Sequence, residues 1–112
     1  NTLVPPIGRA DAARVLIRTA CDLYHITGHN LLHGRSLEVL AGQFKAAAFA
    51  LRAKCFLETG RFLRETTVLA AALTGPDRAV LQGGQGLTEE NLEVRSLLLI
   101  GWAGQIIRED MP

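Results

Sequence analysis

The sequence predicts an all-α protein, a four- to five-helix bundle whose helices run mostly antiparallel. Apolar side chains recur at helical spacing along most of the chain, and no stretch alternates apolar and polar residues as a strand does. Residues 97–107 carry no charge at all. A helix that is apolar nearly all round for three turns must be covered on most sides, so it belongs inside a bundle or against a partner.

Length and composition indicate one domain with one core. The chain has 112 residues, which is enough for a single core but not for two. We expect residues 1–8, which contain two prolines, to be a linker or the remnant of a leader, and residues 9–110 to form the bundle. Aromatic residues make up only 5% of the chain, so Leu, Ala, Ile and Val are expected to fill the core. We also expect the chain to be a domain of a longer protein.

Charge and hydropathy exclude two classes of partner. The chain has 12 Lys and Arg against 11 Asp and Glu, a net charge of +1, and so carries no strong nucleic-acid signature. Its longest uncharged run is shorter than the roughly 20 residues that span a bilayer, which predicts no membrane partner.

Cys21 and Cys55 lie within helical patterns and are expected to be buried thiols. A reducing, cytoplasmic location is therefore expected.

The first half of the chain contains two predicted long helices. The elements, in order, are a helix over residues 9–27, a short extended segment near residues 30–34, a short turn over residues 36–40 and a central helix over residues 43–59. Gly28 is expected to end the first helix in the left-handed conformation, and Gly60 to end the second. The central helix carries two adjacent apolar stripes, as a helix in the middle of a bundle does.

The second half contains three predicted helices. A helix over residues 62–73 is followed by a short one over residues 77–82, for which Thr74 is the expected N-cap and Pro76 suits the first turn. A glycine-rich connector follows. Thr88 is then the expected N-cap of a long final helix that reaches Asp110, with two glutamates in its first turn.

Three histidines recur every four residues in the first half of the chain: His25, His29 and His33. On one continuous helix they would share a face, and zinc or nickel could use two of them with Asp22. Because Gly28 and Gly34 are expected to interrupt the helix, we predict instead that Tyr24, His25 and His29 cap and cover a helix end, where donor side chains meet free carbonyls, and that no metal site forms.

Arg18 and His25 lie two turns apart on the first predicted helix. The pair resembles the Arg-x(4–6)-His motif of the HEPN family, in which the histidine acts as acid or base and the arginine neutralises a phosphate. That resemblance implies an RNase site on a four-helix bundle. The alternative is that both side chains belong to a solvated helix face.

Charged residues also cluster around Gly60, where Glu58 precedes the glycine and Arg61 and Arg64 follow it. The simpler interpretation is a solvated corner between two helices. The functional interpretation is a binding rim, because two guanidinium groups beside a glycine turn and a helix N-terminus could bind a phosphate.

Two segments carry a family resemblance: the sequence LLHGRSL at residues 31–37, and ALRAKCFLETGRF at residues 50–62. They resemble the downstream half of nucleotidyltransferases of the minimal and aminoglycoside-modifying type. The resemblance implies a helical bundle that follows a catalytic domain and helps form the acceptor-substrate cleft. Magnesium and nucleotide would belong to that catalytic domain, and no cofactor is expected in this chain, which has no Asp-x-Asp motif and is itself expected to be non-catalytic.

The final helix also predicts self-association. Gly101 and Gly104 would form a groove of small residues bordered by Trp102 and Ile106, which suits close contact between helices. We expect a homodimer through this groove, or contact with a catalytic domain of the same parent protein. The alternative function from another class is a protein–protein interaction module, either a dimerising bundle or a helical-repeat adaptor resembling a chaperone.

Overall fold

The computed structural model describes residues 8–110, and within them it confirms the all-α bundle. The elements are α1 (Arg9–His29), the π-helical turn η1 (Asn30–Gly34), α2 (Leu37–Thr59), α3 (Thr66–Ala72), α4 (Gly75–Gln82) and α5 (Leu92–Asp110). The linker expected at residues 1–8 falls, apart from Gly8, outside the described residues.

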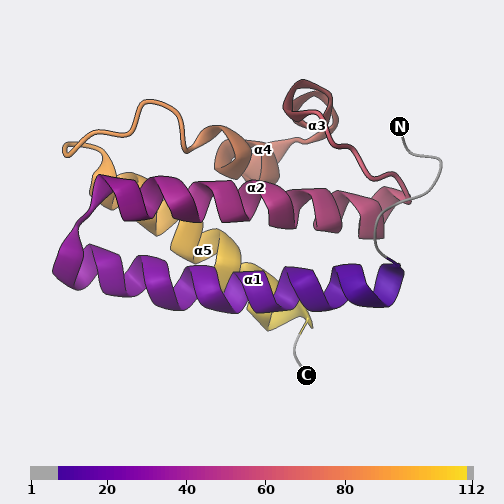
Figure 1. Cartoon of the computed structure of the whole chain (residues 1–112), viewed down its shortest axis with the longest axis horizontal. Helices are drawn as coiled ribbons and strands as arrows, with labels where there is room; N and C mark the ends of the chain where they lie inside the picture. Colours follow the sequence, from indigo (N-terminus) through magenta and orange to yellow (C-terminus); the bar gives the residue numbers. More distant parts are fainter. Residues whose placement is uncertain (1–7, 111–112) are drawn as a thin grey trace.

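The long helices form the body of the bundle. Helices α1 and α2 lie side by side and antiparallel, and α5 crosses them diagonally (Figure 1). The short helices α3 and α4 lie along the opposite side of α2 from α1. None of the helices in residues 8–110 is long and apolar enough to cross a membrane.

Alanine and leucine fill the core, as the composition predicts. Fully buried alanines on α1 and α2 let these two helices approach closely, since a methyl group takes little space. Leucines from α1, α2 and α5 fill the remaining volume, with a few aromatic side chains. The largest fully buried apolar residues are Leu23, Leu40, Leu51, Leu69, Val80, Leu92 and Leu99.

The predicted extended segment at residues 30–34 is wrong. Helix α1 continues through Gly28, and residues 30–34 form one π-helical turn. The residue in the left-handed conformation is Arg35, with φ of 48°. The cause is Asn30, whose buried side chain accepts a hydrogen bond from the Ser36 backbone N–H and donates one to the Ser36 carbonyl. This clamp widens the last turn, so that the Arg35 N–H donates to the Asn30 carbonyl five residues back.

Other predicted helix boundaries also differ from those in the structure. The predicted turn at 36–40 and the helix at 43–59 are one helix, α2, which Ser36 caps by accepting a hydrogen bond from the Val39 N–H at 3.1 Å. Gly60 ends α2 as predicted, with φ of 80°. The helix predicted over 62–73 is shortened to α3. Cys55 is buried as expected, whereas Cys21 is exposed.

Thr88 caps a turn before α5 rather than α5 itself. Its hydroxyl oxygen accepts a hydrogen bond from the Asn91 N–H at 3.2 Å, and the Asn91 side-chain oxygen accepts one from the Thr88 N–H at 2.8 Å. This is the reciprocal arrangement of a capping box, placed one turn early. The helix begins at Leu92.

Candidate functional site

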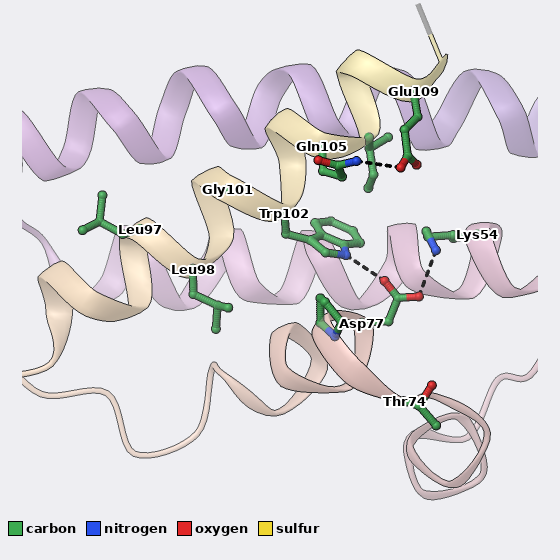
Figure 2. Close-up of a pocket in the computed structure, with 11 residues that line it drawn as sticks. Lys54, Thr74, Asp77, Leu97, Leu98, Gly101, Trp102, Gln105 and Glu109 are labelled. Carbon is green, nitrogen blue, oxygen red and sulfur yellow. Dashed lines mark hydrogen bonds and ion pairs between the residues drawn. The ribbon is translucent and has the colours of Figure 1, made fainter.

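A hollow of about 700 Å³ lies between α4 and α5 at one side of α2. Apolar side chains of α5 form much of its lining, and polar groups stand at its edge (Figure 2). We call it the α4–α5 groove. Its lining residues are Lys54, Thr74, Pro76, Asp77, Leu97, Leu98, Gly101, Trp102, Gln105, Ile106 and Glu109.

The start of α4 places Asp77 at this groove. Thr74 precedes the helix in an extended conformation and Gly75 has φ of 59°, so the chain turns sharply into the helix. Pro76 occupies the first turn, where its missing N–H leaves no hydrogen bond unmade. Asp77 follows in the same turn, where the helix dipole favours a negative charge. The Thr74 position agrees with the predicted N-cap, although its side chain makes no capping hydrogen bond.

Asp77 connects three helices. Its Oδ1 accepts a hydrogen bond from the Trp102 indole N–H of α5 at 2.9 Å, and its Oδ2 accepts one from the Lys54 ammonium of α2 at 2.9 Å (Figure 2). Lys54 also donates to Glu58 Oε2 at 2.7 Å. The Asp77 carboxylate therefore joins α4 to α2 through Lys54 and to α5 through Trp102.

Lys54 is held as a cation. Burial of its ammonium lowers the pKa, but the hydrogen bonds to Glu58 and Asp77 and the charges of these carboxylates raise it by more. The pKa of Lys54 consequently lies above its ordinary value of 10.5. Both Lys54 and Asp77 are about four-fifths covered, with 20% of each side chain exposed, so the pair is less screened than a surface ion pair.

The α5 side of the groove is open. Gly101 is exposed, and a Cβ added there would meet nothing within 4 Å. Leu97, one turn earlier, is 52% exposed. Near the end of the helix the Gln105 amide donates to Glu109 Oε2 at 2.7 Å, so Glu109 places a carboxylate at the edge of the groove.

The four residues expected at an interface divide between the core and this groove. Trp102 and Ile106 are buried, at 7% and 3% exposure. Gly104 faces α1, because a Cβ there would lie 3.1 Å from Cε2 of Tyr24. Only Gly101 of the four is exposed. The structure therefore uses Gly104 for packing within the chain, and the expected homodimer stays a prediction.

The other predicted site residues do not gather at the groove. Glu58, Arg61 and Arg64 are exposed at the corner after α2, where Glu58 accepts the hydrogen bond from Lys54. Arg18 and His25 are both exposed on α1 but line different surface hollows. The RNase alternative stays a prediction.

Sequence reasoning missed the central contact of the groove. Asp77 was expected only to begin the short helix over residues 77–82. Lys54 and Trp102 are 23 and 25 residues from Asp77, and no local pattern links them. One sequence signal could have pointed to Asp77. This aspartate directly follows Thr-Gly-Pro and lies in the first turn of the helix for which Thr74 is the expected N-cap.

The comparisons with known proteins give no relative. No protein-family model matches the chain, and neither a curated protein nor a solved structure matches it.

Proposed function

We propose that this chain is a non-catalytic binding domain, the substrate-side helical domain of a nucleotidyltransferase-like protein. In this proposal the α4–α5 groove forms one wall of the acceptor-substrate cleft, and the catalytic groups belong to another domain of the parent protein. The family part of the proposal is supported by the resemblance of residues 31–37 and 50–62. The binding part is supported by the groove itself.

The charge around the groove is the observation that carries the proposal. One ammonium and two carboxylates line it, and Lys54 is already neutralised by Asp77 and by Glu58. Glu109 then leaves the edge acidic, above an apolar wall of Leu97, Leu98 and Trp102. A ligand that combines amino groups with an apolar body matches this surface, and an amine-bearing acceptor such as an aminoglycoside has that chemistry.

The test uses Trp102, the single tryptophan of the chain, as the reporter. We expect neomycin, a polycationic aminoglycoside, to change its fluorescence in a saturable way, and uncharged maltotriose to leave it unchanged. Glu109→Gln should weaken neomycin binding about three- to fivefold, as the loss of one partly exposed charge pair does. Glu90→Gln, an identical change at an exposed position before α5, is the matched control. No response up to about 10 mM neomycin, or equal weakening in both variants, would contradict the proposal.

A second candidate function, a protein–protein interaction module, is favoured by one observation. The outward face of α5 carries Val94, which is 67% exposed, and Leu97 beside the groove. Exposed apolar residues at helical spacing are typical of helix docking faces. In sedimentation equilibrium we expect a dimer that Leu97→Glu dissociates and that Leu32→Glu, an exposed leucine on η1, leaves intact. A chain that stays monomeric at high concentration would exclude a second copy as the partner.

A further inference from the structure

The three histidines that were expected to be separated by a helix break lie on one continuous surface. Because α1 continues through Gly28 into η1, His25, His29 and His33 stand on successive turns and line one hollow of about 660 Å³. All three side chains are exposed. The hollow lies at the hairpin between α1 and α2 and shares no lining residue with the α4–α5 groove.

Two of these rings stand at the distance that a shared metal ion requires. The ring centroids of His29 and His33 are 4.6 Å apart, with the ring planes at 45°. With metal–nitrogen distances of about 2.0–2.1 Å and an angle between about 90° and 110° at the ion, two imidazole centroids are separated by about 4.5–5.2 Å. The observed separation falls in this range. His29 ends α1 and His33 lies in η1, so the pair keeps the four-residue sequence spacing of zinc-binding helices but spans a wider turn.

From this juxtaposition we propose that His29 and His33 bind a divalent transition-metal ion of the zinc, nickel and copper class. Imidazole nitrogen suits exactly this class of ion, whereas magnesium and calcium prefer oxygen. Within residues 8–110 no group of three or more His, Cys, Asp or Glu side chains could hold one ion. The site therefore supplies two protein ligands, and water or a donor atom from a bound molecule completes the coordination.

The turn between α1 and α2 fixes the backbone that carries the two ligands. The buried Asn30 lies between them in sequence, and its two hydrogen bonds to Ser36 lock the turn on which His33 stands. Arg35, the nearest cation in sequence to His33, donates to the Leu31 carbonyl and lies 3.8 Å from a Glu93 carboxylate oxygen. Because this backbone is already ordered, binding an ion costs conformational entropy mainly in the two imidazole side chains.

The test is a calorimetric titration of the chain with zinc chloride, after removal of any purification tag. A Cys21→Ser background removes the exposed thiol as a competing ligand. We expect one ion per chain, with His29→Ala and His33→Ala each weakening the affinity about tenfold or more. His25→Ala is the matched control and should leave the affinity unchanged. Copper should bind more tightly than nickel or zinc, as nitrogen ligands dictate.

The same titration can overturn the proposal. Absence of binding, or a loss of affinity in His25→Ala equal to that in His29→Ala, would show solvated histidines with no defined ligand pair. Because all three histidines are exposed, their replacement should leave the fold intact, and thermal unfolding followed by circular dichroism verifies this for each variant. A His29→Ala or His33→Ala variant that folds normally and binds zinc as tightly as the parent would also refute the pair.

Discussion

The bundle of α1, α2 and α5 and the segment from Gly60 to Asn91 are held in different ways. The long helices bury alanine and leucine side chains completely and are stabilised by close apolar packing. The Gly60–Asn91 segment buries five apolar side chains, those of Phe62, Leu63, Leu69, Leu73 and Val80, of which only Leu69 and Val80 lie in its two short helices α3 and α4.

Polar side chains from the long helices attach that segment at three places. Arg52 of α2 donates to the Arg64 carbonyl from Nε at 3.0 Å and from Nη2 at 2.9 Å. Lys54 and Trp102 hold Asp77 at the start of α4. Arg95 of α5 donates to the carbonyl oxygens of Gly83, at 2.5 Å, and Gln85, at 2.7 Å.

The two kinds of contact therefore determine different properties: the stability of the domain and the position of α4. Apolar packing makes the main contribution to the free energy of unfolding of the whole domain, because nearly all of the buried side chains are apolar. The polar contacts set where α4 lies relative to α5 and hence the shape of the groove. We therefore expect substitutions in the two regions to differ in size and in what they disturb.

The largest effect is expected in the core of α5. Leu99→Ala removes a fully buried side chain and should lower the free energy of unfolding by about 2–5 kcal/mol. Leu97→Ala, the same change on the same helix at an exposed position, should cost far less. Chemical denaturation measures both. Equal costs would mean that α5 is not packed against α1 and α2 as described.

A smaller effect is expected at the groove. Lys54→Met removes the cation between Asp77 and Glu58. The mostly covered Asp77 carboxylate then keeps only the Trp102 indole as a hydrogen-bond partner, so the free energy of unfolding should fall by about 1–3 kcal/mol. The fluorescence of Trp102 should change as well, since its hydrogen-bond acceptor is disturbed. Lys45→Met, on the same helix, is the control. A fluorescence spectrum identical to wild type would show that Asp77 does not depend on Lys54.

The pH dependence of this pair has a defined sign. Because the pKa of Lys54 is raised in the folded chain, its stabilising contribution is fully present below the ordinary value of 10.5 and is lost as the pH rises through the higher folded value. The difference in unfolding free energy between wild type and Lys54→Met should thus stay constant between about pH 7 and 9 and shrink above about pH 10.5. A difference that grows with alkalinity would contradict the direction of the shift.

The cap before α5 is expected to contribute less. Thr88→Ala removes the acceptor of the Asn91 N–H and should cost about 1 kcal/mol, the usual value for a helix cap. Glu89→Ala changes an exposed neighbour without touching this hydrogen bond, so it separates the cap from a general effect on the turn. Denaturant midpoints of the two variants give the comparison.

The smallest effect, with the opposite sign, is expected at Ser96. Its hydroxyl is buried in α5 and has no hydrogen-bond partner within residues 8–110. Ser96→Ala removes this unsatisfied group and adds a better helix former, so stability should stay unchanged or rise by up to about 1 kcal/mol. Ser36→Ala removes a working cap and should lower it. A loss at Ser96 as large as at Ser36 would reveal a partner for the Ser96 hydroxyl.

The difference between the apolar packing of the long helices and the polar contacts of the Gly60–Asn91 segment also explains which features the sequence could predict. Apolar periodicity and the glycine at position 60 locate the long helices, because they report local and repeated features of the chain. The π-helical turn was missed since it depends on Asn30 bonding to Ser36 six residues later, and a glycine-based rule places the end of α1 too early. The groove depends on contacts over more than twenty residues, between Asp77 and two other helices, for which one sequence carries no local signal.

The π-helical turn η1 also sets how the hairpin tolerates changes in length. A π-helical turn holds about one residue more than an α-helical turn, and each residue of an α-helix rotates the chain by about 100°. Deletion of one residue within Asn30–Gly34 would let the turn close as an α-helix and would rotate the point where the chain leaves that helix by about this angle around the α1 axis. The hydrogen bonds between Asn30 and Ser36, which join the end of α1 to the start of α2, would then be broken. Substitutions at exposed positions of this turn, such as Leu32, should consequently be tolerated far better than insertions or deletions of a single residue, whereas Asn30 should tolerate neither.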